Sequence, residues 1–336
     1  MEATTTGGDN TSIGWGSLVL NTTGASNTAL GRSSLAANTT ASNNTAVGYH
    51  SLLANTTGTE NVAIGMQSCD AQTTASYNTA LGFDTLSANV LGSRNVAIGR
   101  AALQVMNPTS AVNMYNVAIG YGAGESVTTG VSNTLIGGLA GDAITTGVRH
   151  ICIGIDSGAT LTTGNDSIFI GHGAGASTGA ASGQIALGNV TCVGNGNFTF
   201  GSGSNDSNIQ NGATSITAPS DERFKEEVAD STAGLSFIND LRPVTYKWKK
   251  EKDLPTTMDA YVEGSEKRVM NDNTNHGFIA QEVKAAIDAH PELKDGFDMW
   301  MEKDSDGQQR VAPSALVPML VKAIQELTAR IETLEG

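Results

Sequence analysis

Residues 78–82 read NTALG, residues 95–99 read NVAIG and residues 116–124 read NVAIGYGAG. The phrase that they share, Asn-x-Ala-aliphatic-Gly, recurs with small variations eleven times at a spacing of 17 residues, apart from one spacing of 21 around Pro108. The glycines that close the copies are Gly14, Gly31, Gly48, Gly65, Gly82, Gly99, Gly120, Gly137, Gly154, Gly171 and Gly188. Such a fixed period indicates a stacked repeat protein, because one short copy cannot bury its own apolar faces.

Each copy predicts a short strand with one aliphatic face and one small face. The residue before the glycine is Ile, Leu or Val in every copy, and the residue two positions earlier is Thr, Val or Ile. These two positions share a face of a strand. The residue between them is usually Ala, as at Ala29 and Ala46, so the opposite face has to fit a narrow space. We expect the copies to stack as a β-solenoid about 50 Å long, at a strand spacing of about 4.8 Å.

The composition changes near Pro219. Residues 1–219 hold 4 Lys+Arg and 10 Asp+Glu, whereas residues 220–336 hold 15 and 23, and 34 of the 40 glycines precede the boundary. We therefore predict a mainly β protein with four parts. These are a repeat β-solenoid shaft or head over residues 1–190, a Gly/Asn/Ser-rich neck over 191–219, a small α+β domain over 220–316 and a C-terminal coiled-coil helix over 317–336.

Net charge and hydropathy exclude several classes of partner. The formal net charge of −14 argues against nucleic acid, because phosphate neutralisation needs clustered Lys and Arg, and equally against an anionic membrane surface. No run of about 18 apolar residues occurs, so we expect no membrane insertion. The first ten residues, MEATTTGGDN, lack the basic and apolar stretches of a signal peptide.

The repeat region offers little catalytic chemistry. Its Asp and Glu residues are scattered singly, which argues against the carboxylate pair of a glycosidase. Its histidines, at positions 50, 150 and 172, fall in three different columns of the repeat, so we expect a solvated rod surface and neither a metal nor a cofactor. Cys69, Cys152 and Cys192 occupy slots that elsewhere hold small or apolar residues, so we interpret them as packed thiols.

The column after the closing glycine is the candidate recognition surface. It contains Trp15, Tyr49, Phe83 and Tyr121, together with Arg32 and Arg100. Exposed aromatic and Arg residues on a rigid ladder could bind a glycan or a surface protein. The alternative is a corner position under weak constraint.

The last residues predict a helix with an apolar seam. Apolar residues recur at spacings of 3, 4, 3, 4 and 3, at Val317, Leu320, Ile324, Leu327, Ile331 and Leu334. This heptad pattern favours partner helices, and the mixture of Ile and Leu leaves the number of strands open.

The repeat phrases resemble those of trimeric β-roll adhesin heads and of bacteriophage tail-fibre shafts. In those families three chains stand side by side, and the resemblance implies that the small strand face lies near the trimer axis. A solenoid trimer would also make the C-terminal coiled coil three-stranded.

The second half resembles the peptidase S74 family, which forms the intramolecular chaperone and auto-processing domain of phage tail spikes and tail fibres. Four motifs occur in the family's order: SDERFK at 220–225, PVTYKWK at 243–249, GFIAQEV at 277–283 and LVPMLVKAIQEL at 316–327. Phe224 stands where the family usually has Leu. The resemblance covers residues 220–336 and implies a domain that helps three chains to trimerise and then cuts itself off.

The same resemblance implies a Ser/Lys dyad that acts once. Ser220 would attack the carbonyl of Pro219 after Lys225, kept neutral, takes its proton, and cleavage would release residues 220–336. Arg223 could lower the pKa of Lys225 or stabilise the oxyanion. The alternative is that SDERFK begins a helix capped by Ser220. The uncleaved domain would then be a permanent trimerisation cap.

These observations predict a trimeric phage fibre or spike protein of the virion, assembled in the host cytoplasm, which attaches to a host surface glycan or protein and to other virion tail proteins. Three alternatives are a bacterial adhesin, which would carry a signal peptide and a membrane anchor, a spike that degrades surface polysaccharide, and an ice-binding threonine ladder. The Thr pairs of that ladder are interrupted at Val90-Leu91 and Gly179-Ala180.

Overall fold

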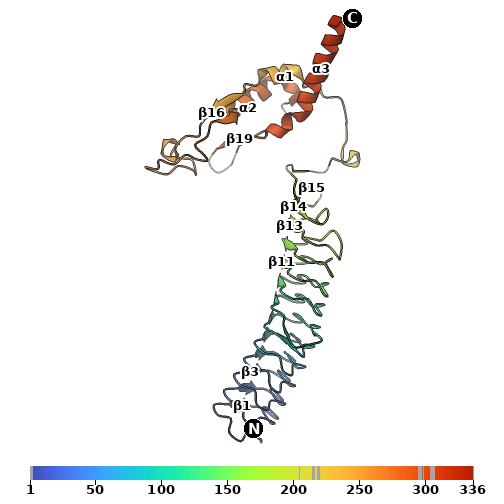
Figure 1. The fold of residues 1–336 in the computed structure, drawn as a ribbon, viewed down its shortest axis with the longest axis vertical. Helices are drawn as coiled ribbons and strands as arrows, with labels where there is room; N and C mark the ends of the chain where they lie inside the picture. The colour runs from blue at the N-terminus through green and yellow to red at the C-terminus, as the bar shows by residue number, and fades with distance from the viewer. Residues whose placement is uncertain are drawn as a thin grey trace. The chain divides into compact units, whose positions relative to one another are not determined.

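The computed structural model describes residues 3–203, 205–213, 216–217, 220–293, 297, 299–302 and 307–335. The chain divides into two compact units, Met1–Glu222 and Arg223–Gly336. The first is a β-solenoid and the second a small α+β unit that ends in a helix (Figure 1). The predicted mainly β class, with its eleven-turn solenoid, is confirmed.

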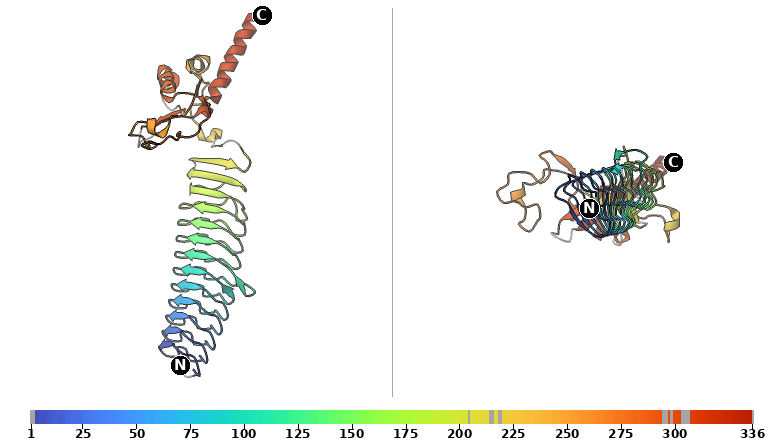
Figure 2. Two further views of the ribbon diagram at one scale, coloured as in Figure 1. Left: turned by 60° about the vertical axis from the view of Figure 1, so that its left-hand side comes forward. Right: turned by 90° about the horizontal axis from the view of Figure 1, so that it is seen from below.

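One sheet runs along the solenoid, and its repeat strands are parallel and in register (Figure 2). Ala80 lies beside Ala97, and Ala97 beside Ala118, so each turn places the same residue one strand further along the sheet. The eleven strands of the copies are β1 (Thr11–Ile13), β2 (Thr28–Leu30), β3 (Thr45–Val47), β4 (Val62–Ile64), β5 (Thr79–Leu81), β7 (Val96–Ile98), β9 (Val117–Ile119), β10 (Thr134–Ile136), β11 (Ile151–Ile153), β12 (Ile168–Ile170) and β13 (Ile185–Asn189).

Four further strands depart from the repeat. In the stretch expected to be a neck, β14 (Asn197–Ser202) continues the parallel sheet and β15 (Asn205–Gln210) pairs with it antiparallel. At the four-residue insertion, β8 (Val112–Asn113) pairs in parallel with β6 (Gly92–Ser93). The insertion also adds two buried side chains, Met106 and Met114, to the core.

The small face of each strand points into the solenoid, which corrects one expectation. The middle residue, such as Ala29, Ala46 or Ala80, is fully buried and packs against the leucine of the following corner, such as Leu35. The Ala column therefore cannot form the trimer axis. Alanine fits there in the turns whose corner carries a leucine, because close packing then leaves room for only a small strand residue opposite it.

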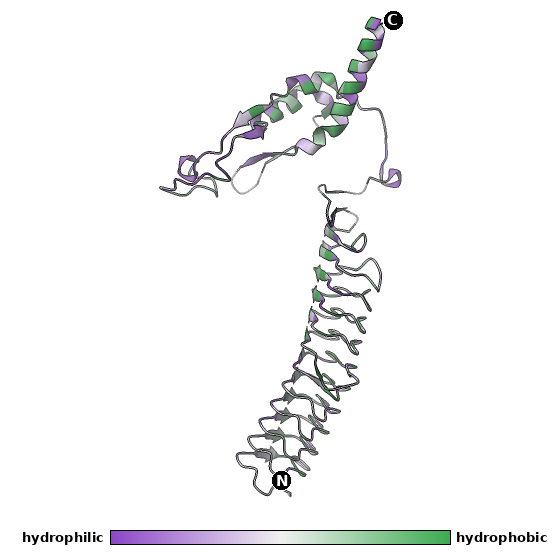
Figure 3. Ribbon diagram, in the orientation of Figure 1, coloured by the Kyte–Doolittle hydropathy of each residue, from purple (hydrophilic) through white to green (hydrophobic). Residues whose placement is uncertain are grey.

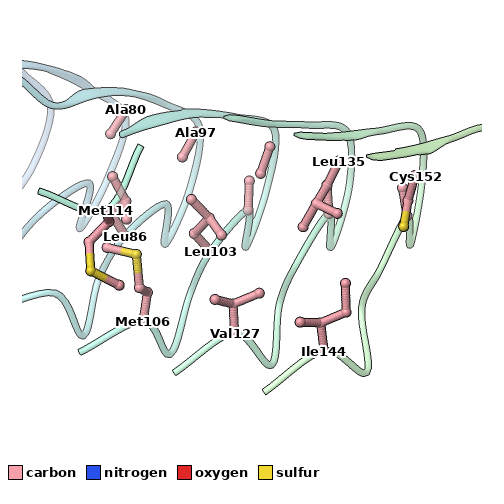
Figure 4. Packing of buried hydrophobic residues seen from close by; sticks show 14 of the residues in the cluster. Ala80, Leu86, Ala97, Leu103, Met106, Met114, Val127, Leu135, Ile144 and Cys152 are labelled. Carbon is pink, nitrogen blue, oxygen red and sulfur yellow. The ribbon is translucent and has the colours of Figure 1, made fainter. Parts of the chain in front are cut away.

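The core changes its composition along the rod, and a larger side chain at one position accompanies a smaller one at another (Figure 4). In the first six turns a small strand residue faces a Leu or Cys at the corner, as Ala97 faces Leu103. In later turns the corner residue is Gly, and larger residues such as Leu135 and Ile144 fill the space. A Cβ on Gly141 would lie 2.7 Å from both of these side chains. Volume is thus conserved from turn to turn, as close packing demands.

The predicted packed thiols are confirmed. Cys69, Cys152 and Cys192 are buried and free, and Cys69 takes the corner slot of the leucines. Burial raises the pKa of the Cys69 and Cys152 thiols to about 12. Both are therefore protonated and unreactive at neutral pH.

A ladder of buried asparagines joins the turns. The Asn27 backbone N–H donates to Oδ1 of Asn10 at 2.9 Å, and the Asn44 N–H donates to Oδ1 of Asn27 at 3.0 Å. In most members the side-chain amide in turn donates to a corner carbonyl, as Asn27 Nδ2 does to Ala41 O at 2.9 Å. Each amide therefore satisfies backbone groups of its neighbours that would otherwise be buried without a partner. The members of this ladder are Asn10, Asn27, Asn44, Asn61, Asn78, Asn95, Asn116 and Asn133.

His150 continues this ladder, so its expected place on a solvated surface is wrong. Its side chain is fully buried, Nε2 donates to Gly164 O at 2.5 Å and Nδ1 accepts from the Ser167 N–H at 3.3 Å. A neutral imidazole offers one donor and one acceptor, as the asparagine amide does. Burial lowers the pKa of His150. His50 and His172 are on the solenoid surface, His50 half-buried and His172 exposed.

The second unit packs helices on short strands. Its helices and strands are α1 (Leu235–Asp240), β16 (Val244–Tyr246), β17 (Asn275–Gly277), α2 (Ala280–Ala289), β18 (Trp300–Glu302), β19 (Gln309–Val311) and α3 (Val317–Glu335), and its 3-10 helices are η1 (Glu222–Phe224), η2 (Glu251–Asp253), η3 (Pro291–Leu293) and η4 (Pro313–Leu316). Its core is formed by Phe237 of α1, Val283 and Ile287 of α2, Met299 and Leu316. Strands β16 and β17 pair antiparallel, as do β18 and β19.

The closing glycines generate the first prediction. Gly65 has φ of 135°, and a Cβ there would lie 2.2 Å from the carbonyl oxygen of Gly82 in the next turn. Backbone strain should therefore lower the free energy of unfolding of Gly65→Ala by about 1–3 kcal/mol, and the steric overlap should lower it further. Gly138→Ala is the matched control, since nothing lies within 4 Å of its Cβ. Urea unfolding should show a lower midpoint for Gly65→Ala alone, and equal midpoints would contradict this packing.

The buried histidine generates the second prediction. Because the folded-state pKa of His150 lies below 6.5, the unfolded chain binds the extra proton first, and stability falls as the pH drops through 6.5. The free energy of unfolding then falls by up to about 1.4 kcal/mol per pH unit for one proton. His150→Asn restores the ladder residue and should remove this loss between pH 7 and pH 5. His172→Asn, an exposed control, should retain it, and identical pH profiles for both variants would refute the prediction.

Candidate functional site

The outer face of the strand ladder is apolar and exposed. The first and third residues of each repeat strand point away from the core. The third is always Ile, Leu or Val, and Ile13, Leu81 and Ile170 remain 60%, 43% and 39% exposed. We call these two positions, in the eleven repeat strands, the aliphatic ladder. It follows the whole solenoid, and apolar colouring marks the strands near β11 and β13 (Figure 3). A continuous apolar strip of this length is unusual on a monomer and marks an interaction surface.

Helix α3 has one packed face and one exposed face. Its packed face contributes Met319 and Ala323, next to Leu316 of η4, against the core of the second unit. The Glu326 carboxylate accepts from the Leu235 N–H at 2.9 Å and so caps the start of α1. The predicted seam is exposed, and polar and apolar residues alternate along the helix (Figure 3). Its members are Val317, Leu320, Ile324, Leu327, Ile331 and Leu334.

The predicted recognition residues line one edge of the aliphatic ladder. We call the positions directly after the closing glycines the post-strand edge. Trp15, Tyr49 and Tyr121 are exposed there, and Phe83 is half-buried. Arg32 Cζ lies 5.2 Å from the Trp15 ring centroid and 5.6 Å from that of Tyr49, within the range of cation–π attraction. The structure therefore brings these side chains into stacks with arginines between the rings.

The opposite edge holds residues that sequence reasoning missed. We call the positions five residues before the closing glycines the pre-strand edge. Tyr77, Arg94 and Tyr115 stand here, and Arg94 Cζ lies 4.6 Å from the Tyr77 ring centroid. Residues of this column have positive φ, such as 63° at Arg94, which turns the chain into the strand. Comparing all seventeen columns of the repeat would have revealed this edge.

The proposed dyad residues are exposed. Ser220 and Lys225 flank η1, and both have exposed side chains. Pro219, on the other side of the predicted cleavage site, lies outside the described residues. The unit boundary after Glu222 assigns Ser220 to the first unit and Lys225 to the second. A lysine base has to lose its proton, which takes burial or nearby positive charge.

Two of the family-like motifs meet in the second unit. PVTYKWK supplies β16 and GFIAQEV begins in β17, where Val244 lies opposite Gly277. Arg242 Nε donates to Glu282 Oε2 at 2.9 Å, which ties the segment before β16 to α2. This ion pair is exposed, so its contribution to stability is small.

His290 joins helices α1 and η3 through charged hydrogen bonds. Its Nε2 lies 2.9 Å from Asp240 Oδ2, and its Nδ1 lies 3.0 Å from Glu292 Oε1. The hydrogen bond to Asp240, followed by that to Glu292, raises the pKa of His290. Its ring packs edge-on against Phe237 at 5.4 Å. This contact therefore holds the helices of the unit together most strongly when the imidazole is protonated.

Two features are absent from the described residues. They contain no group of three or more His, Cys, Asp or Glu side chains arranged to hold a metal ion. Within the same residues, no helix has the length and apolarity needed to cross a membrane.

One known family resembles part of the C-terminal region. Residues 220–291 match the model of the peptidase S74 family, described as the chaperone of endosialidase. The chain thus combines an eleven-turn β-solenoid with a region that matches this family's model. No curated protein and no solved structure matches the chain significantly.

Proposed function

We propose that the chain is a homotrimeric fibre or spike protein of a bacteriophage virion. The observation that carries this proposal is a pair of exposed apolar seams, the aliphatic ladder of the solenoid and the heptad face of α3. Both occur in a chain whose residues 220–291 match a chaperone family. Two further copies of the chain are the partners that fit, since each copy would bring the same two seams.

The aliphatic ladder suits the side-by-side association of three chains. Its strands are already paired along the rod, so the free surface is a side-chain face and not a strand edge. Completely burying a Leu or Ile contributes about 1.5–3 kcal/mol, and ladder side chains such as Leu81, which is 43% exposed, would gain roughly half of this at each turn. Three rods around a common axis would cover the aliphatic ladder of each, and the Ala column would remain inside each rod.

Helix α3 would align the three chains. Its heptad face is free because its opposite face packs on α1, so trimerisation would not require the second unit to rearrange. The mixture of Ile and Leu permits several strand numbers, and the family match favours three.

The solenoid would carry host attachment. Its post-strand edge presents aromatic rings and arginines on a rigid support, which suits a surface glycan or protein. In the virion the fibre would join other tail proteins after assembly in the host cytoplasm.

Self-cleavage between Pro219 and Ser220 would complete maturation. In a single chain the side chains of Ser220 and of the proposed base Lys225 are both exposed. Neighbouring chains of the trimer would supply the burial and positive charge that release its proton. Cleavage would therefore follow assembly and leave the fibre kinetically trapped.

The third prediction tests the helical seam. Ile324→Asp with Ile331→Asp should convert the trimer to monomers, because two charges would enter the apolar seam of each helix. Gln325→Asp with Thr333→Asp adds the same charge at exposed positions off the seam and should remain trimeric. Light scattering coupled to gel filtration measures the mass. A trimer in both double variants would refute the role of α3.

The fourth prediction tests self-cleavage. Wild-type protein should yield a fragment beginning at Ser220, whereas Ser220→Ala and Lys225→Ala should remain at full length. Ser231→Ala is the control, since Ser231 is exposed and lies outside the motif. Denaturing gels and intact mass measure the products. If the wild type is trimeric yet uncleaved, the domain is a permanent trimerisation cap.

A further inference from the structure

Turns five to seven carry the same side-chain order on both edges of the aliphatic ladder. Along the post-strand edge the order is Phe83, Arg100, Tyr121, and along the pre-strand edge it is Tyr77, Arg94, Tyr115. The strands between them, β5, β7 and β9, are neighbours in register. We call these six residues the arginine band. In these turns each edge therefore has an aromatic residue, an arginine and an aromatic residue in succession.

The arginines of the band are held against rings. Arg100 Cζ lies 5.8 Å from the Phe83 ring centroid and 5.3 Å from that of Tyr121, and Arg100 Nη1 donates to Tyr121 Oη at 2.9 Å. Arg94 packs on Tyr77, and its Nε donates to Asn113 Oδ1 at 3.2 Å. Both guanidinium groups are exposed, so they are positioned in advance and still accessible. Each retains N–H donors beyond these bonds.

The charge of these arginines is not neutralised within the described part of the chain. The solenoid has four arginines, Arg32, Arg94, Arg100 and Arg149, and no lysine. Among the described residues Arg149 alone of the four forms an ion pair, with Asp166 at 2.5 Å, and the other three pack on aromatic rings. The chain has a net charge of −14, and among the described turns of the solenoid the band is the one place where two arginines without an ion pair share a turn.

The proposed trimer brings these cations closer. Three-fold symmetry about the aliphatic ladder sets the post-strand edge of one copy beside the pre-strand edge of the next. Arg100 of one copy would then face Arg94 of its neighbour at the same height. Two cations cannot pair with each other, so this arrangement favours a bound anion between them.

We propose that the arginine band binds an acidic, carboxylate-bearing polysaccharide. Guanidinium groups match carboxylates in geometry, and aromatic faces stack against sugar rings. The two rings on each edge are two strand spacings apart, about 10 Å, with the arginine between them. This spacing is close to the length of a disaccharide in an extended chain. The inference deepens the attachment function proposed above and rests on it.

The experiment uses full-length protein on an array of bacterial capsular polysaccharides, some containing uronic acids and some neutral. Wild type should bind the acidic members, and binding should weaken as salt is added. Arg94→Gln with Arg100→Gln should bind roughly tenfold more weakly or worse, because charge-assisted hydrogen bonds are lost. Arg149→Gln is the matched control: it lies on the pre-strand edge like Arg94, but is already paired. It should bind as the wild type does.

Four outcomes would overturn the site. The double variant could bind like the wild type, the neutral polysaccharides could bind as well as the acidic ones, or light scattering could show that the double variant no longer forms trimers. The last result would assign the band to assembly. If no polysaccharide binds, the site is also refuted, and a cell-binding assay then decides the attachment function separately. Fibres that bind bacteria would retain that function, and fibres that do not would contradict it as well.

Discussion

Most strands of the solenoid follow a buried backbone N–H that an asparagine side chain of the preceding turn satisfies, and before β12 the acceptor is His150. Asn27 does this for Asn44, and the same amide donates to a carbonyl of the following corner. A turn that lost this amide would leave two buried polar groups without partners. The ladder therefore fixes the register of the turns that it joins. It also fixes which strand face is inside, since the asparagine and the middle strand residue are buried on the same side.

The remaining features of the rod follow from that orientation. With the small residue inside, the aliphatic residues have to face outwards. The rod therefore presents an apolar strip whose exposure to water is unfavourable. The closing glycines pack against the carbonyls of the next turn, so no side chain can be added there to cover the strip. Polar and aromatic groups can vary only along its two edges. Assembly and recognition are thus assigned to neighbouring surfaces of the same strands.

The repeat predicted the solenoid because its period and β-branched positions depend on local chemistry alone. Sequence reasoning still assigned the Ala column to the trimer axis, because alternation shows that two faces differ but not which one is inside. Sequence reasoning placed His150 on the surface for a related reason. Its column is defined by hydrogen bonding, and a neutral imidazole supplies the same donor and acceptor as an asparagine amide although the residue type differs. Arg94 was missed because its contact with Tyr77 joins adjacent turns.

The uniformity that makes the rod stable also makes its assembly ambiguous. Each turn of the aliphatic ladder carries Thr, Val or Ile at its first position and Ile, Leu or Val at its last, so three rods displaced by one turn would bury almost the same apolar surface. The features that distinguish turns, the insertion near β8 and the arginine band, lie at the side of the ladder and contribute only after the rods have met. A helix with its own heptad register, joined after the last turn, can align the chains before the rods associate. Register selection is therefore a physical reason for a C-terminal chaperone.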